Sequence, residues 1–227
     1  MVVLVALAVV ALAVLILGPQ MWVHRTLAAH AGDRTDLPGT GAELARHLLD
    51  LGGLTDVPVE RVAKGADHYD PQARRVCLGP EAHDTRSVTG IAVAAHEAGH
   101  AFQHADGDRL LAWRIALAPV VRGIEIVAAV VLSLAPLTFA LVKSPVAVGL
   151  QIGLAVLLMT SRVVVHLLTL PVELDASFGR ALPILERGGY LAGPDLTAAR
   201  SVLRAAAMTY VASALATLLN VVRWFRL

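Results

Sequence analysis

The chain has 227 residues, of which 56% are hydrophobic and 16% are charged, and its formal net charge is +1. This much apolar surface exceeds what a soluble domain of the same size needs, so the composition favours a small multipass membrane protein. The near-neutral charge, with no block of like charges, sets aside a nucleic-acid partner. The lone Cys77 cannot form an internal disulfide, and we assign it no function.

The N-terminal segment has the composition of a membrane anchor. Residues 2–17 form an unbroken apolar run, and Trp22 lies where an interface is expected, so the segment 1–23 can span the bilayer core. No Lys or Arg precedes the run and no small-residue cleavage site follows it, which favours a retained anchor over a cleaved signal peptide. The basic residues that follow favour a cytoplasmic location for their side of the membrane. They are Arg25, Arg34, Arg46, Arg61, Lys64, Arg74 and Arg75.

Residues 24–114 form the one substantial polar region, and their pattern predicts a compact α+β domain. A helix is expected between Thr40, as its N-cap, and the glycine pair that begins at Gly52. The short runs VPVERVA and RRVCL flank GADHYDPQ, whose Gly, Asp and Pro predict a turn, so a small hairpin or sheet is expected. A second helix is expected over about 87–106, where Gly107 follows.

Two further apolar stretches follow at about 117–142 and 146–170, and the KSP between them predicts a tight turn. A hairpin folded about this turn would place Glu125 beside Arg162 and Arg122 near His166. Because an unpaired charge at that depth is costly, a Glu125 to Arg162 ion pair is expected to fix the register of the hairpin.

Two more helices are expected after the hairpin. The first runs from about Val172 to Arg187, and the second from about Leu196 to Arg223. The second helix either spans the membrane or lies against the other helices, because its Thr, Ser, Tyr and Asn residues weaken a lipid-facing role.

The motif that carries chemistry is AAHEAGHAFQH, residues 94–104. In an α-helix, His96 and His100 share one face and Glu97 lies beside it. HExxH is the pattern in which two neutral imidazoles bind Zn²⁺ from adjacent turns while the glutamate polarises the metal-bound water. The alternative is a polar seam of hydrogen-bonded histidines. The apolar flank GIAVAA makes that alternative weaker, because it indicates a buried site.

A catalytic zinc needs a third protein ligand, and the candidates are His104, His166, Glu173 and Asp175. On a straight helix His104 would give poor tetrahedral angles, so it is either a group beside the site or an exposed helix-end residue. Glu173 is the better ligand, because two apolar stretches after His100 return the chain to the side it left. Asp175 is placed to orient a ligand histidine. Acidic residues are also favoured in the first turn of any helix, so that alternative stays open for both carboxylates.

The chain resembles the bacterial neutral zinc metallopeptidase family of membrane proteases, sometimes called YugP-like. The motifs that carry the likeness are, in order, TGAELARHLLDLGGLTDVPVE, DHYDP, GIAVAAHEAGHAFQH, LPVELDAS and AARSVLRAAAMTYVA. The resemblance implies a membrane-anchored HExxH peptidase of gluzincin type, with His96 and His100 as zinc ligands and Glu97 as catalytic base. ELDAS also resembles a shortened form of the third-ligand region in HtpX and CAAX-type membrane peptidases, which supports Glu173.

The sequence therefore predicts a multipass α-helical protein of the bacterial inner membrane, with a small α+β zinc-peptidase domain that faces the cytoplasm. The expected segments are an N-terminal anchor (1–23), a peptidase domain with the HExxH helix (24–114), a transmembrane hairpin (115–170), a third-ligand helix (171–190) and a membrane-associated C-terminal helix (195–227).

The expected reaction is hydrolysis of peptide bonds in membrane or membrane-proximal proteins, with Zn²⁺ as cofactor and the lipid bilayer as a further partner. Glu97 would take the proton of the attacking water, and His104 and Tyr210 are candidate donors to the resulting oxyanion. Two other classes of function are a non-catalytic scaffold and a metal carrier. The presence of Glu97 argues against both, because neither needs a general base.

Overall fold

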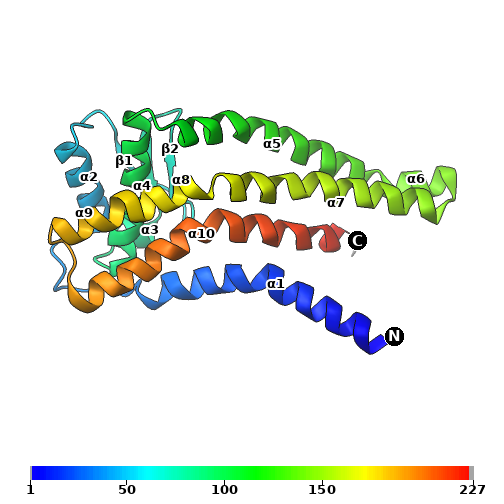
Figure 1. The fold of residues 1–227 in the computed structure, drawn as a ribbon, viewed down its shortest axis with the longest axis horizontal. Coiled ribbons are helices and arrows are strands. Elements are labelled where there is room, and N and C mark those ends of the chain that lie inside the picture. The colour runs from blue at the N-terminus through cyan, green and yellow to red at the C-terminus, as the bar shows by residue number, and fades with distance from the viewer. Residues whose placement is uncertain (1, 225–227) are drawn as a thin grey trace. The chain divides into compact units, whose positions relative to one another are not determined.

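The computed structural model describes residues 2–224, which are mostly helical with one small sheet (Figure 1). The chain divides into two compact units, each built from segments that are far apart in the sequence. Unit 1 comprises Met1–Gln20, Trp113–Thr169 and Tyr210–Leu227, and unit 2 comprises Met21–Ala112 and Leu170–Thr209. The chain therefore changes unit after residues 20, 112, 169 and 209.

Unit 2 contains the polar region of the sequence. Its helices are α2 (Gly41–Leu51), α3 (Pro80–His83), α4 (Val88–Ala105), α8 (Leu170–Leu174), the π-helix η1 (Asp175–Ala181) and α9 (Leu182–Arg187), together with the last residues of α1 (Val2–Ala29) and the first part of α10 (Gly193–Trp224). These helices pack around one apolar core that includes Leu49, Leu78, Leu185 and Leu203.

Helix α2 begins and ends where the sequence predicts. Thr40 and Glu43 form a capping box, because the Glu43 N–H donates to the Thr40 hydroxyl and the Thr40 N–H donates to the Glu43 carboxylate. Helix α4 has the expected limits as well. The Ser87 hydroxyl accepts the Gly90 N–H at its start, and Gly107 follows its end with a φ of +69°, which favours glycine.

The expected runs form a small three-stranded sheet and not a simple hairpin. β1 (Val59–Arg61) pairs with β3 (Arg75–Leu78) in parallel, and β2 (His68–Asp70) pairs with the other side of β3 in antiparallel orientation. The segment expected as a turn therefore contains a strand. Tyr69 faces the core, and Asp70 ends the strand because its carboxylate accepts the next N–H groups, those of residues 72 and 73.

Helix α4 lies inside unit 2, with most of its side chains buried. Alanine is the commonest residue at its buried positions, and its small side chain allows other elements to approach closely. The closest approach is at Gly99, where a Cβ atom would lie 2.8 Å from the carbonyl oxygen of Ala176 in η1. The glycine inside the HExxH motif therefore lets η1 pack directly against the motif.

The segment expected as one helix from Val172 to Arg187 changes its winding. It begins as α8, widens into η1 and returns to α-helix in α9. Pro183 lacks an N–H group and cannot donate to the carbonyl of residue 179, which disfavours an ordinary α-helical register there. A π-turn of this kind is frequent at functional sites.

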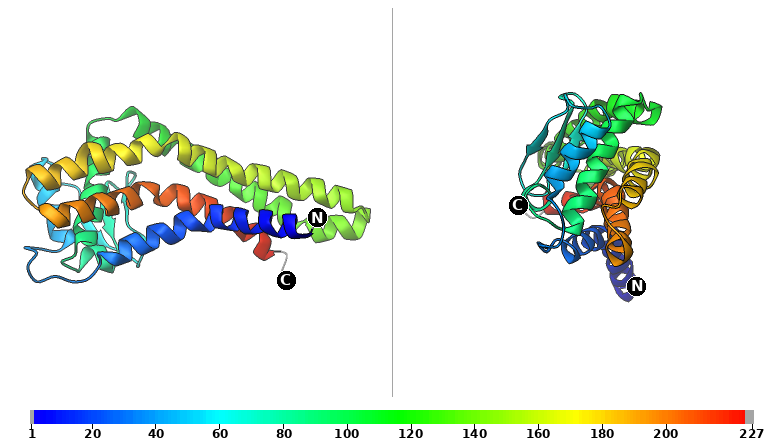
Figure 2. Two further views of the ribbon diagram at one scale, coloured as in Figure 1. Left: turned by 60° about the horizontal axis from the view of Figure 1, so that its bottom comes forward. Right: turned by 90° about the vertical axis from the view of Figure 1, so that its left-hand side faces the viewer.

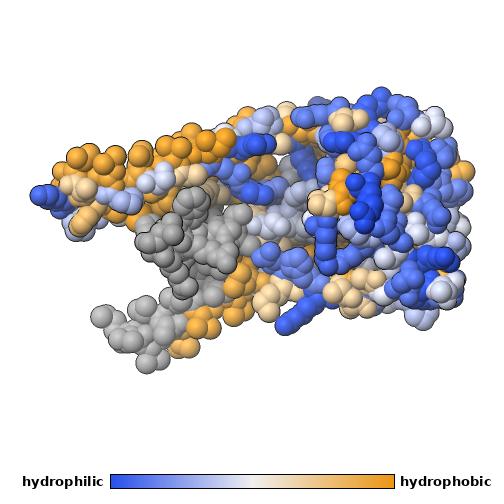
Figure 3. Space-filling view, turned by 180° about the vertical axis from the view of Figure 1, so that it is seen from behind, coloured by the Kyte–Doolittle hydropathy of each residue, from blue (hydrophilic) through white to orange (hydrophobic). Residues whose placement is uncertain are grey.

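Unit 1 contains α5 (Arg109–Ser133) from its fifth residue onward, α6 (Ala135–Val142) and α7 (Pro145–Leu168), with parts of α1 and α10. Lys143, with a φ of 52°, and Ser144 form the expected turn between α6 and α7. Many large apolar side chains of these helices are exposed, and Figure 3 shows them gathered on the surface. Examples are Val130, Leu141, Val146, Leu150 and Leu157.

Within the described residues, two helices are long and apolar enough to cross a membrane by length and composition. They are Arg109–Ser133 and the continuous helical segment Pro145–Arg187. Fewer than a fifth of the residues in the relevant window of either one are buried. Such exposure distinguishes them from the core helices of a soluble protein.

Polar side chains of unit 1 contact one another across its helices. The Arg162 guanidinium lies 2.9 Å from the Glu125 carboxylate, so the expected ion pair is present. Arg122, expected near His166, is exposed. The His166 ring stacks on the Tyr210 ring with centroids 5.5 Å apart, and the Arg114 guanidinium lies 4.5 Å from the centre of the Tyr210 ring. Tyr210 thus joins α10 to α5 and α7.

Candidate metal centre

Two histidines of α4 and a glutamate of α8 come together inside unit 2. The Nε2 atoms of His96 and His100 each lie 3.2 Å from Oε2 of Glu173. The three residues are at most 3% exposed, and their ligand atoms all lie within 4.8 Å of one another. Of the candidate third ligands, the structure brings Glu173 to the histidine pair.

The hydrogen bonds of His100 determine which of its ring nitrogens carries the proton. The Gln103 amide nitrogen donates to the carbonyl of Val172 and to the carboxylate of Asp175, both at 2.9 Å. This places the amide oxygen of Gln103 2.8 Å from Nδ1 of His100, where it can only accept. Nδ1 is therefore protonated, and in the neutral ring the Nε2 lone pair faces Glu173.

The hydrogen bonds of His96 determine its tautomer in the same way, with a different partner. The Ser177 hydroxyl donates its one proton to the carbonyl of Leu203 at 3.0 Å. It must then accept from Nδ1 of His96, which lies 2.9 Å away. Nε2 of His96 is left with a lone pair that also faces Glu173. Both histidines thus present the nitrogen that a metal requires.

Two imidazole lone pairs and a carboxylate oxygen that face one another in a buried space repel unless a cation lies between them. Ligand atoms 2.0 to 2.2 Å from one tetrahedral Zn²⁺ would be about 3.3 to 3.6 Å apart. The observed separations of 3.2 Å are close to this spacing. The alternative, two buried imidazolium ions with ring centroids 4.7 Å apart, brings like charges together at a high desolvation cost. The donor set therefore fits zinc.

Glu97 follows the first ligand in the chain, and its side chain is 6% exposed. A carboxylate at this position can accept a proton from a water molecule at the ligand cluster. Cys77 of β3 is 1% exposed, and burial raises the pKa of its thiol. The thiol is therefore protonated, which makes it a poor metal ligand.

The sequence predicts that Asp175 orients a ligand histidine directly, whereas in the structure Gln103 lies between Asp175 and His100. Its carboxylate accepts hydrogen bonds from Gln103 and from Arg180, and Arg180 also pairs with Asp106 at 2.6 Å. Burial raises the pKa of Asp175, but the hydrogen bonds from Gln103 and Arg180 outweigh it and hold the pKa below its ordinary value. Asp175 thus orients Gln103, and Gln103 orients His100.

Sequence reasoning missed the residues that contact the Nδ1 atoms, Gln103 and Ser177. Helical spacing could have found both. Gln103 lies three positions after His100 on the same helix, and Ser177 lies four positions after Glu173. Each polar residue is therefore within one turn of a ligand.

The remaining candidates contact other residues. His104 belongs to unit 2, and its Nδ1 lies 2.9 Å from the hydroxyl of Tyr69 on β2. Tyr210 and His166 belong to unit 1, where their rings stack on each other. The structure therefore gives His104 a partner from the sheet and gives Tyr210 a packing role.

A family model described as "Putative neutral zinc metallopeptidase" matches residues 5–227. The chain belongs to this family. It is also similar to "Putative membrane protease YugP" of Bacillus subtilis (strain 168), with 37% identity over 187 residues that cover 82% of this chain and 79% of the relative. No solved structure matches. The family resemblance drawn from the sequence motifs is confirmed. The buried cluster of two histidines and a glutamate is compatible with the zinc site that membership of this family implies.

Proposed function

We propose that this chain is a zinc-dependent endopeptidase that hydrolyses peptide bonds in membrane or membrane-proximal proteins. The observation that carries the proposal is the convergence of His96, His100 and Glu173, in which both Nε2 lone pairs face one oxygen of the Glu173 carboxylate. A hydrogen-bonded polar seam would pair donors with acceptors, whereas this arrangement pairs acceptors with acceptors. Membership of a zinc metallopeptidase family supports the same reading.

A bound zinc ion supplies Lewis-acid chemistry, lowering the pKa of water and polarising the substrate carbonyl. Glu97 accepts the proton of the attacking water and returns it to the amine that leaves, as a general base and then a general acid. Gln103 and Ser177 hold the two histidines in the tautomer that binds metal. His104, held by the Tyr69 hydroxyl, is the candidate donor to the developing oxyanion.

The membrane part of the proposal rests on unit 1. We assign the first part of α1, the hairpin of α5, α6 and α7, and the second part of α10 to the bilayer, because the described apolar side chains of this unit are largely exposed. The relative carries the name of a membrane protease, which supports the assignment. An even number of crossings between His100 and Glu173 puts both halves of the site on one side, which we take to be the cytoplasm of a bacterial cell.

The catalytic proposal is tested by comparing the wild type with Glu97→Gln. The purified variant should keep its zinc, measured by elemental mass spectrometry. Membranes that carry the variant should lack the new protein N-termini that cleavage by the wild type produces, as a proteomic comparison would show. Glu186→Gln, at an exposed glutamate of α9, is the matched control and should cleave normally. Equal cleavage by Glu97→Gln and the wild type would overturn the proposal.

The topology is tested by cysteine labelling after Cys77→Ala has removed the one native thiol. Single cysteines at Lys64 and Gly189 should react from the cytoplasmic side, and one at Ser144 from the outside. Labelling of positions 64 and 189 from opposite sides would contradict the assignment, because the two halves of the metal site could then not meet.

A further inference from the structure

Residue types typical of a membrane interface occur where the chain changes unit. Trp113 and Tyr210 are the first residues after two of these boundaries, and Trp22 lies two residues after a third. Trp22 and Trp113 are 41% and 67% exposed. Exposed Trp and Tyr rings are enriched at the level of lipid headgroups. Each of these residues therefore marks the place where its own segment would meet the headgroups.

Three exposed arginines of unit 2 lie close to these boundaries in the sequence. Arg25 is on α1, and Arg200 and Arg204 are one turn apart on α10. In the part of the chain that the structure describes, none of the three forms an ion pair. Helix α1 contains no acidic residue, and between Gly193 and Tyr210 the only one is Asp195, which pairs with Arg34. These arginines thus form a cationic surface without internal compensation.

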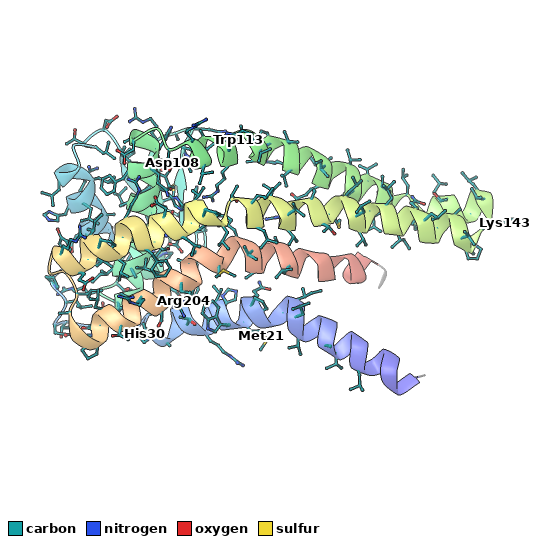
Figure 4. All side chains as sticks on the ribbon, viewed as in Figure 1. Met21, His30, Asp108, Trp113, Lys143 and Arg204 are labelled. Carbon is teal, nitrogen blue, oxygen red and sulfur yellow. The ribbon has the colours of Figure 1, made fainter. Side chains whose placement is uncertain are left out.

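The arginines lie on neighbouring helical segments of unit 2. Arg34, in the loop that follows α1, lies 2.6 Å from Asp195 at the start of α10, and the last residues of α1 lie beside the first part of α10 in Figures 1 and 2. Arg25 lies between Met21 and His30 on α1, and Arg204 lies nine residues after Asp195 on α10. In Figure 4, Arg204 on α10 lies between the levels of Met21 and His30 on α1 along the long axis. Cations from both helices can therefore reach one layer of anions.

We propose that Arg25, Arg200 and Arg204 bind the phosphate headgroups of anionic phospholipids. Guanidinium groups bind phosphate oxygens in a bidentate way, and basic residues beside a membrane segment are attracted to anionic lipid. Trp22, three residues before Arg25, locates this surface at headgroup depth. The inference rests on the membrane part of the proposed function and is independent of catalysis.

The test uses full-length protein in vesicles, with Trp113→Phe and Trp224→Phe so that Trp22 is the single fluorophore. Brominated phosphatidylglycerol and brominated phosphatidylcholine serve as quenchers, and their ratio gives the relative affinity of the two lipids around Trp22. We expect a preference for phosphatidylglycerol of several fold in the parent protein. Each Arg→Gln change at the three positions should reduce the preference in part, and the triple change should bring the ratio close to one.

Control variants separate charge from folding. Arg→Lys at all three positions should keep most of the preference, and Arg187→Gln, at an exposed arginine of α9, should leave it unchanged. Zinc content and thermal melting show whether each variant is folded. Equal quenching by the two lipids in the parent, or an undiminished preference in the folded triple Arg→Gln variant, would overturn the proposal. No quenching by either brominated lipid would instead remove the membrane assignment itself, whatever the outcome for peptidase activity.

Discussion

The two units handle their polar and apolar side chains in opposite ways. Unit 2 buries an apolar core and, within it, the polar ligands and their hydrogen-bonding partners. Unit 1 exposes apolar side chains, and its polar residues pair across neighbouring helices, as Glu125 and Arg162 do. Unit 2 therefore keeps its apolar side chains away from water, whereas the exposed apolar surface of unit 1 supports the proposal that this unit lies in the bilayer.

Two glutamines, one in each unit, illustrate this difference between the units. Gln103 of unit 2 is fully buried, and its amide makes three hydrogen bonds, one of which holds a metal-ligand histidine. Gln151 of unit 1 donates to the carbonyl of Val131 at 2.6 Å and joins two helices. The same side chain thus organises a metal site in one unit and a helix contact in the other.

The largest effect expected is the loss of a ligand. His100→Ala should lower zinc affinity by more than about 100-fold, because a site with three protein ligands loses one of its strongest bonds. His104→Ala, one turn farther along α4, is the control and should bind zinc nearly as well as the wild type. Isothermal titration or competition with a chelator measures both. Loss of zinc in His104→Ala with retention in His100→Ala would contradict the ligand set.

A smaller effect on the same quantity is expected from the glutamine pair. Gln103→Leu should lower zinc affinity by about 10 to 100-fold, because His100 loses the acceptor that fixes its tautomer. Gln151→Leu should change thermal stability and leave zinc affinity unaltered. If both variants affected zinc equally, the glutamine of α4 would have no special relation to the metal.

The ion pair of unit 1 should contribute less. A double-mutant cycle on Glu125→Gln and Arg162→Gln should give a coupling energy of about 0.5 to 2 kcal/mol, the range of polar contacts between membrane helices. Glu125→Arg combined with Arg162→Glu should recover stability that either single change loses. Thermal unfolding in lipid discs measures the cycle. Damage in the swapped double variant equal to that in the worse single variant would show that the two side chains act separately.

The smallest effect concerns Asp67, outside the metal site. Its carboxylate accepts the Gly79 N–H at 2.8 Å, and burial raises its pKa above the ordinary value. The folded state then binds a proton more tightly than the unfolded state. This contribution to stability is present below the unfolded pKa and is lost as pH rises through the folded pKa. Asp67→Asn should abolish that part of the pH dependence of unfolding, whereas Asp33→Asn should leave it in place.

The sequence by itself determined the local features of this protein. Helical periodicity places His96 and His100 on one face, a capping box starts α2, and a glycine ends α4, because these features depend on neighbours within one or two turns. The hairpin register that pairs Glu125 with Arg162 follows from the short turn at Lys143 in the same way.

Only the tertiary structure decided what depends on contacts between distant segments. It brings Glu173 to the histidines across more than 70 residues of chain, through the close packing of η1 on Gly99. It also pairs β1 with β3 in parallel and puts Gln103 and Ser177 against the ligands. Carboxylates at 173 and 175 have similar local sequence signals. The widened winding of η1 and the packing of α8 on α4 determine which of them faces the metal, and these arise from burial and close packing rather than from spacing.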